Sequence, residues 1–313
     1  MKEYAIGVDI GGTTVKLGLF DRQGQVLEKW EIPTVQEDQG SHILPDIAAA
    51  VKDRMASRGL TKDEILGVGV GAPGPVDTEG TVYKAVNLGW DVFNIPQVLQ
   101  AQLDLPVKAA NDANVAAFGE MWQGGGKGHA NIVAVTLGTG VGGGIIVNGS
   151  ILTGATGAGG EIGHIHIEDN EPDPCGCQNH GCLEQYASAT GVVRLARRRL
   201  AQDQEPSILR SRSELSAKAV WDAVKAEDRV AVQIAKQFGE YLGKGLAAVA
   251  AVVNPEVFVI GGGVSKAGEI LFDYIRPAYE KYVFHGCRNA RFALATLGND
   301  AGIFGAAGLI INE

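Results

Sequence analysis

The chain has 313 residues with a formal net charge of −9, and 44 of its residues are glycine. Glycine is about twice as frequent as usual, but it clusters instead of recurring every third residue, which excludes a collagen-like fibre. With 45% hydrophobic residues, the chain can bury enough apolar surface to fold, and its length fits two domains. The negative charge excludes nucleic acid as a main partner, because phosphate backbones are bound through Lys and Arg.

Apolar runs and cysteines indicate where the protein is located. No signal peptide precedes the first strand-like run, and the longest small apolar stretch, residues 246–253, is too short to cross a bilayer. Three of the four cysteines fall between residues 175 and 182, which suggests a metal site in a reducing compartment. We therefore expect a cytoplasmic protein that binds no membrane. The one basic cluster, Arg194 with Arg197 to Arg199, is expected to be a solvated helix face.

Hydrophobic periodicity predicts an alternation of strands and helices along the chain. The first half is predicted to hold a three-stranded meander, a helix, two strands and an alanine-rich helix, over residues 4–10, 15–20, 25–32, 43–58, 66–70, 107–110 and 112–122. The second half restarts with a strand at 131–137, a glycine turn at 138–144 and strands at 144–147 and 150–152. After a loop, helices are predicted at 188–202, 215–224, 228–253, 269–284 and from 300, with strands at 256–260 and 292–295.

The two halves therefore follow the same pattern, although their residues are not identical. Each half opens with a strand, a glycine turn and a second strand, and then alternates helices and strands. This pattern predicts two α/β domains with mixed sheets that face one another across a cleft.

The first glycine turn, Asp9-Ile-Gly-Gly-Thr-Thr-Val-Lys16, is suited to bind phosphate. Glycines let the backbone approach an anion, and threonine hydroxyls and exposed N–H groups can donate to phosphate oxygens. Asp9 ends a buried strand, where its carboxylate can hold a hydrated Mg²⁺. An ordinary hairpin turn would carry the same two glycines, so the turn alone does not decide between the two interpretations.

The second glycine turn runs from Leu137 to Gly144. Gly138, Gly140 and Gly143 satisfy the spacing of a dinucleotide-binding fingerprint, but that fingerprint must open a helix. Here the turn leads into Ile145-Ile-Val147, a β-branched strand. We therefore expect a second phosphate-binding hairpin and not an oxidoreductase.

The cysteine cluster and the polar residues near it predict a further site. Three thiols with His164 suit a tetrahedral zinc ion, although His166 and His180 are also close enough in sequence to be the fourth ligand. Glu161 and Glu184 flank this cluster, where they could present carboxylates to hydroxyl groups. Asn111-Asp112 precedes the alanine-rich helix, so this pair is suited to cap the helix, and Asp112 also to act as a general base.

Together these motifs resemble the ROK family (repressor, open reading frame, kinase) over essentially the whole chain. The motifs that carry the resemblance are Asp9 to Thr13, Gly71 to Gly74, Asn111-Asp112, Leu137 to Gly144, Gly154 to His164, Cys175 to Glu184 and Gly261 to Gly263. The resemblance implies the actin-like hexokinase (ribonuclease H-like) fold. It also implies a small domain of residues 1–110 and 301–313, and a large domain of residues 111–300 with the zinc loop.

The resemblance implies ATP-dependent transfer of the γ-phosphoryl group to the 6-hydroxyl of glucose, with Mg²⁺ as cofactor and a structural Zn²⁺. Asp112 is implied as the catalytic base. The residues implied to bind hexose are Gly74, Asn111, Asp112, Glu161, His164 and Glu184. Those implied to bind ATP and Mg²⁺ are Asp9, Gly11, Gly12, Thr13, Thr14, Lys16, Gly138, Thr139, Gly140 and Gly262. The zinc ligands implied are His164, Cys175, Cys177 and Cys182.

Several alternatives follow from the same resemblance. Fructose, mannose, N-acetylmannosamine or N-acetylglucosamine could replace glucose, and polyphosphate or ADP could replace ATP. The family also includes sugar-responsive DNA-binding repressors, but here the first glycine turn begins by residue 9, so we expect no DNA-binding segment.

Many members have Lys at the position of Thr14, whereas the nearest lysine here is Lys16. A homodimer or homotetramer is expected from the family.

Overall fold

The computed structural model describes residues 2–312 and divides into two compact units. Unit 1 contains the described residues up to Ala130, the segment Gly144–Gly160 and the described residues from Leu297 onward. Unit 2 contains Asn131–Gly143 and Glu161–Thr296. The chain thus returns to unit 1 at its carboxyl end.

The first sheet has the strand order β3-β2-β1-β4-β7 and lies in unit 1. Its strands are β1 (Tyr4–Ile10), β2 (Thr14–Asp21), β3 (Val26–Pro33), β4 (Ile65–Ala72) and β7 (Val107–Asn111). The first three strands form an antiparallel meander, whereas β1, β4 and β7 run parallel. The sheet is therefore mixed, as the sequence predicts.

The second sheet repeats this order as β10-β9-β8-β11-β12. Its strands are β8 (Ile132–Leu137), β9 (Val141–Val147), β10 (Ser150–Ile151), β11 (Val257–Gly261) and β12 (Arg291–Leu294). Strands β8, β11 and β12 run parallel, and β9 pairs antiparallel with β10. The shared order confirms the prediction of two similar halves.

The helices agree with the prediction at most positions. The described helices are α1 (Glu37–Gly40), α2 (Ile43–Ser57), α3 (Ile95–Leu103), α4 (Asp112–Gln123), α5 (Glu184–Ala187), α6 (Ala189–Gln202), α7 (Ala217–Lys225), α8 (Arg229–Val253), α9 (Ile270–Tyr282) and α10 (Ala301–Ile311). The prediction missed the short helices α1 and α5. It also missed α3, and with it the two-stranded sheet of β5 (Thr81–Val82) and β6 (Phe93–Asn94). The Asn94 side chain caps α3 by accepting a hydrogen bond from the backbone N–H of Gln97, a signal already present in the sequence.

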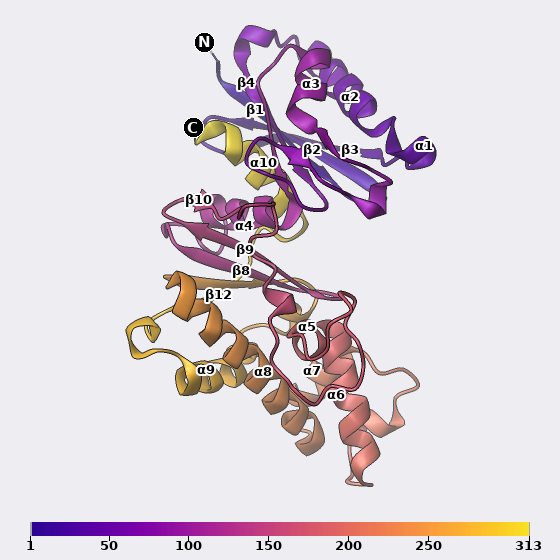
Figure 1. The fold of residues 1–313 in the computed structure, drawn as a ribbon, viewed down its shortest axis with the longest axis vertical. Coiled ribbons are helices and arrows are strands. Elements are labelled where there is room, and N and C mark those ends of the chain that lie inside the picture. The colour runs from indigo at the N-terminus through magenta and orange to yellow at the C-terminus, as the bar shows by residue number, and fades with distance from the viewer. Residues whose placement is uncertain (1, 313) are drawn as a thin grey trace. The chain divides into compact units, whose positions relative to one another are not determined.

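The first sheet is covered on both faces, as Figure 1 shows for α2 and α3 on one side and α10 on the other. Alternate residues of β1 point to opposite faces. Ile6 and Val8 join the core that contains α2 and α3, whereas Ala5 packs with Ile303 of α10. This arrangement explains why β1 is apolar throughout except for Asp9 at its end.

Glycines let α10 lie directly on the backbone of the first sheet. A Cβ atom at Gly7 would come 2.0 Å from the carbonyl oxygen of Ile303, and one at Gly69 would come 1.8 Å from that of Ala306. Asp9 points to the same face, where its carboxylate lies against Gly302. The close approach of α10 therefore buries the carboxylate at the end of β1.

Unit 2 has its own core around β8, β11 and β12 of the second sheet. β11 is buried along its whole length, and Phe258 stacks on Phe292 of β12 with ring centroids 5.4 Å apart. Helix α8 packs against α9 on one side and against α6 and α7 on another. The glycine turn of this unit is shorter than predicted, because Val141 to Gly144 already belong to β9.

The compact units differ from the predicted domains in where residues 111–130, 144–160 and 297–300 lie. Helix α4 packs against α10, and a Cβ atom at Gly305 would come 1.7 Å from the carbonyl oxygen of Val115. This contact places α4 in unit 1, whereas the sequence assigned it to the large domain. The division into a small and a large domain stays a prediction.

Within residues 2–312, no helix is both long and apolar enough to span a membrane.

We predict that Gly69→Ala destabilises the protein, because the new methyl group would meet the backbone of α10 and the helix would have to move. The expected loss in the free energy of unfolding is about 2 kcal/mol or more, measured by urea denaturation. The control is Gly263→Ala, because Gly263 has ordinary helical backbone angles and a methyl group added there would point into open space. Equal stability of the two variants would contradict the proposed close packing.

Candidate active site

Polar residues gather at the carboxyl edge of the first sheet. Asp9 is the last residue but one of β1 and Asn111 is the last residue of β7, and both strands run parallel to β4 between them. Asp9 lies opposite Gly71 of β4, and Asn111 lies opposite Ala72. Since the carboxyl ends of parallel strands meet at one edge of a sheet, the fold brings these two polar residues to the same edge.

Asn111 both caps α4 and orders the residues around it. Its side-chain Oδ1 accepts a hydrogen bond from the backbone N–H of Asn114 at 3.1 Å. Its Nδ2 donates to the carbonyl oxygen of Gly74 and to Oδ1 of Asp112, each at 3.0 Å. Gly74 has a φ of +87°, and a Cβ atom there would come 2.4 Å from the carbonyl oxygen of Lys84. The structure thus brings Gly74, Asn111 and Asp112 together, and the capping and site interpretations of Asn111 are compatible.

The Asp9 carboxyl group lies in an unfavourable electrostatic environment. Burial and then the negative charge of Asp112 raise the pKa of Asp9 to about 6, against a smaller opposing effect of Lys16. Lys16 lies opposite Asp9 in the β1–β2 hairpin, and its Nζ donates to the carbonyl oxygen of Asn299 at 3.1 Å. Two neighbouring carboxylates with one ammonium group nearby form a place that favours a bound cation.

The first glycine turn joins β1 to β2 and is held from the end of β3. The Thr34 hydroxyl donates to the carbonyl oxygen of Gly11 at 2.7 Å, and the Thr34 N–H donates to that of Thr13 at 2.9 Å. The Gln36 side-chain amide donates to the carbonyl oxygen of Gly12. Gly12 and Thr13 are exposed, so the turn has a fixed shape and an accessible surface.

The second glycine turn belongs to unit 2 and is held by the start of α6. The N–H of Ala189 donates to the carbonyl oxygen of Gly138 at 2.8 Å, and the Thr190 hydroxyl donates to that of Thr139 at 2.7 Å. Gly140 faces Glu184, because a Cβ atom at Gly140 would come 2.5 Å from Oε2 of that residue.

Gly262 lies next to the same turn. It has a φ of +84°, and a Cβ atom there would come 2.6 Å from the backbone nitrogen of Leu137. Unit 2 therefore brings the second glycine turn, Gly262 and Glu184 together. Since β9 continues directly from the turn, no helix begins there, and the dinucleotide-binding fingerprint is excluded.

Four side chains of unit 2 form a cluster that could hold a metal ion. The ligand atoms of His164, Cys175, Cys177 and Cys182 all lie within 4.8 Å of one another. The Sγ atoms of Cys177 and Cys182 are 3.6 Å apart, and Sγ of Cys175 is 3.7 Å from Nδ1 of His164. In a tetrahedral zinc site with Zn–S bonds of about 2.3 Å, the sulfur atoms are about 3.8 Å apart. The four residues therefore fit a tetrahedral ion.

The thiol groups of this cluster differ in their surroundings. Burial raises the pKa of the Cys175 and Cys182 thiols, whereas a backbone N–H at Asn179 lowers the pKa of Cys177, the most exposed of the three. The Cys175 thiol also donates to Oε1 of Glu184 at 2.8 Å. A bound cation would stabilise the buried thiolates.

The structure decides which of the three nearby histidines belongs to the cluster. His166 contacts Asp169 and the carbonyl oxygen of His180, and Nδ1 of His180 contacts the carbonyl oxygen of Glu171. His164 lies in the 3₁₀ turn Ile162–His164, with Nδ1 toward the cysteines and Nε2 3.9 Å from Oε2 of Glu161. One ring nitrogen can thus bind a metal while the other faces a polar group.

The predicted site residues fall into two groups, one in each unit. Unit 1 holds Asp9, Gly11, Gly12, Thr13, Thr14, Lys16, Gly74, Asn111 and Asp112. Unit 2 holds Gly138, Thr139, Gly140, Glu161, His164, Cys175, Cys177, Cys182, Glu184 and Gly262.

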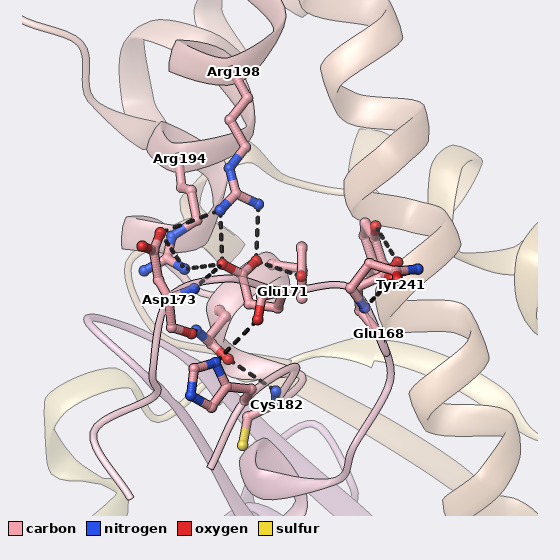
Figure 2. Close-up of polar contacts among 11 residues, drawn as sticks. Glu168, Glu171, Asp173, Cys182, Arg194, Arg198 and Tyr241 are labelled. Atoms are coloured by element: carbon pink, nitrogen blue, oxygen red, sulfur yellow. Dashed lines mark hydrogen bonds and ion pairs between the residues drawn. The ribbon is translucent and has the colours of Figure 1, made fainter. Parts of the chain in front are cut away.

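The sequence prediction missed a buried ion pair beside the metal cluster (Figure 2). The Glu171 side chain is fully buried, and its two oxygens accept hydrogen bonds from Arg198 at 2.7 and 2.8 Å. The Arg198 guanidinium lowers the pKa of Glu171 to about 2. On the same helix, Arg199 pairs with Asp203 at 3.0 Å. The expectation that the arginines of α6 form a solvated face is therefore wrong for Arg199, whose side chain is 7% exposed, and incomplete for Arg198, whose side chain is 39% exposed but pairs with a buried carboxylate.

Comparisons with known proteins agree with this geometry. The sequence profile of the ROK family matches residues 5–313. A glucokinase of Halalkalibacterium halodurans is 43% identical over 98% of this chain and 94% of its own length, and one of Streptomyces coelicolor is 38% identical over 97% and 96%.

Solved structures give the same result. The crystal structure of a ROK family glucokinase from Streptomyces griseus in complex with glucose and AMPPNP is 36% identical, with a TM-score of 0.73 over 98% of each chain. The predicted fold class, an actin-like hexokinase fold of two α/β domains with mixed sheets, is confirmed. The chain belongs to the ROK family.

Proposed function

We propose that this protein is a glucokinase, which transfers the γ-phosphoryl group of ATP to the 6-hydroxyl of glucose. The observation that carries the proposal is the Asp112 carboxylate, held beside Asn111 and Gly74 at the carboxyl edge of a ROK-family sheet. The sugar kinase activity expected from the sequence is confirmed by the glucokinase relatives that match the whole chain.

We propose that Asp112 is the general base that accepts the proton of the 6-hydroxyl. Phosphoryl transfer has a loose transition state, so the protein contributes mainly by positioning the reactants and by stabilising charge. Asn111 supports this role, because its amide donates to Asp112 and holds the carboxylate in place. Binding of the sugar hydroxyls is assigned to Gly74, Asn111, Glu161, His164 and Glu184.

We assign the two glycine turns to the binding of ATP. Thr13, Thr14, Lys16 and the backbone of Gly11 and Gly12 would contact phosphate oxygens from unit 1, and Gly138, Thr139 and Gly140 would do so from unit 2. Gly262 has no side chain and would leave room for the adenosine. Exclusion of water from the bound substrates would prevent hydrolysis of ATP.

Two metal ions complete the proposal. Asp9 would hold a hydrated Mg²⁺, which neutralises phosphate charge when bound; the raised pKa of Asp9 supports this assignment. His164, Cys175, Cys177 and Cys182 would hold a structural Zn²⁺, because the site offers four protein ligands and thus no open position for a reactant.

We also propose that the protein acts as a homodimer or homotetramer in the cytoplasm, where reduced thiols are available to bind zinc.

The choice of glucose is tested by ADP release with a panel of hexoses, comprising glucose, fructose, mannose, N-acetylmannosamine and N-acetylglucosamine. We expect the highest kcat/KM for glucose and ATP. A higher kcat/KM for another hexose would show that this hexose, and not glucose, is the preferred substrate. The absence of sugar-dependent ADP release would contradict the kinase proposal. Parallel reactions with polyphosphate and ADP as donors test the choice of ATP.

We predict that Asp112→Ala lowers kcat by about 10³-fold or more while the protein stays folded, because the 6-hydroxyl would lose its proton acceptor. The measurement is steady-state kinetics with glucose, together with circular dichroism and zinc content. Asp53→Ala removes an exposed carboxylate of α2 in the same unit and should leave kcat unchanged. Near-normal activity of Asp112→Ala would overturn its assignment as the base.

We predict that Asp9→Asn stabilises the protein at pH 7 but abolishes its magnesium-dependent activity. The pKa of Asp9 rises from 3.8 unfolded to about 6 folded, so the folded state binds the proton more tightly than the unfolded state. Stability is therefore lost as the pH rises from 4 to 6, and the penalty remains at pH 7. An uncharged Asn avoids this penalty, for a gain of about 1 to 3 kcal/mol.

The measurement is urea denaturation in magnesium-free buffer at pH 7 and pH 4. We expect the advantage of Asp9→Asn over the wild type to disappear at pH 4, where Asp9 is protonated in the folded state. Asp53→Asn, at an exposed site, is the control and should show no such pH dependence. A constant difference at both pH values would show that the Asp9 charge does not destabilise the fold.

We predict that Cys177→Ala releases zinc and raises the KM for glucose, because His164 would lose the ion that orients its ring. Cys177 is exposed, so the substitution itself disturbs little packing. Cys287→Ala is the control, since Cys287 is buried outside the cluster and donates to the carbonyl oxygen of Ala250. Metal analysis should find about one zinc per chain in the control and none in Cys177→Ala; zinc retained with an unchanged glucose KM would refute the assignment.

A further inference from the structure

We propose that Glu171 is a positioning residue for the sugar site. Its buried carboxylate pairs with Arg198 of α6, and this ion pair, the anchor, fastens residues 165–183, the metal-binding loop, to that helix. The anchor thereby orients Glu184 and the zinc ligands. The proposal rests on the proposed function of Glu184 in sugar binding. It gives a role to two residues that take no part in the chemistry.

The ion pair has the geometry of a strong, specific contact. Both Glu171 oxygens accept from the two terminal nitrogens of Arg198, and the Tyr186 hydroxyl also donates to this carboxylate. Arg194 adds a longer contact at 3.4 Å. Because the Glu171 side chain is completely buried, its charge is stable only with these partners.

The backbone around Glu171 extends this contact into the metal-binding loop (Figure 2). The carbonyl oxygen of Glu171 contacts Nδ1 of His180 at 3.0 Å, and that of Asp173 accepts from Nε2 of Gln185 at 2.9 Å. Oε1 of Gln185 accepts in turn from the backbone N–H of Cys182 at 3.0 Å. The anchor is thus linked through hydrogen bonds to the ligand Cys182 and to Gln185, the residue that follows Glu184.

The helix side of the anchor is itself packed against α8. Tyr186 stacks on Tyr241 of α8 with ring centroids 4.0 Å apart, and the Tyr241 hydroxyl donates to Glu168 at 3.2 Å. Arg198 extends from α6, which packs against α8. A loop fixed to two helices needs little further ordering when a sugar binds, and this favours affinity.

Loss of the anchor should therefore affect sugar binding and metal retention more than the chemical step. The test variants are Glu171→Gln, which removes the charge and keeps the shape, and Arg198→Lys, which keeps the charge and removes the two-pronged contact. Arg199→Lys is the matched control. Arg199 is a buried arginine of the same helix, but its partners Asp203 and Glu205 lie outside the metal-binding loop.

Steady-state kinetics and the rate of zinc release are measured on the zinc-loaded, full-length protein. For Glu171→Gln and Arg198→Lys, we expect the KM for glucose to rise about tenfold or more, with kcat within about threefold of wild type and the KM for ATP unchanged. Zinc transfer to a colorimetric chelator should be about tenfold faster or more. Arg199→Lys should change neither the kinetic constants nor the rate of zinc release, even if its melting temperature falls.

The proposal is overturned if the test variants lower only the melting temperature, as the control does, or if kcat falls while both the glucose KM and zinc release are unchanged. If Glu171→Gln does not fold, Arg198→Lys decides by the same criteria. If the wild type phosphorylates no sugar, the proposed function fails, whereas zinc release still tests the anchor by itself.

Discussion

The proximity of two carboxylates at the carboxyl edge of the first sheet is the constraint on which the proposed chemistry depends. Asp9 and Asp112 come from β1 and from the start of α4. Burial first, and then the negative charge of Asp112, raise the pKa of Asp9 to about 6. The fold maintains this unfavourable arrangement because α10 lies against the glycines of β1 and β4 and covers Asp9. Such an arrangement lowers stability in the absence of ligands and is typical of functional sites.

Unit 2 organises its own group of predicted site residues through different contacts. Glu184 accepts from the thiol of Cys175 and lies against Gly140 of the second glycine turn. One carboxylate therefore links the metal cluster to the residues assigned to phosphate. In the proposed function, a zinc ion bound here would have a structural role, because it would orient His164 and the loop that precedes Glu184 and would not itself react.

Much of the fold could be predicted from the sequence, and so could the residues that gather in the candidate metal cluster, because strands, glycine turns and cysteine spacing leave local patterns. The limits come from effects that depend on tertiary structure. Sequence spacing could not choose among His164, His166 and His180, because the choice depends on how the loop folds back. Arg198 looked like a solvated residue, since nothing local shows that Glu171 is buried opposite it. Helix α3 was missed although its Asn94 cap was visible.

The assignment of Asp112 as the base for a glucose 6-hydroxyl is tested most directly by a crystal structure of the protein with glucose and a non-hydrolysable ATP analogue. We predict that the 6-hydroxyl lies about 2.6–3.2 Å from the Asp112 carboxylate, with Glu161, Nε2 of His164 and Glu184 on the other sugar hydroxyls. A sugar bound away from Asp112, or a different side chain at its 6-hydroxyl, would contradict the account.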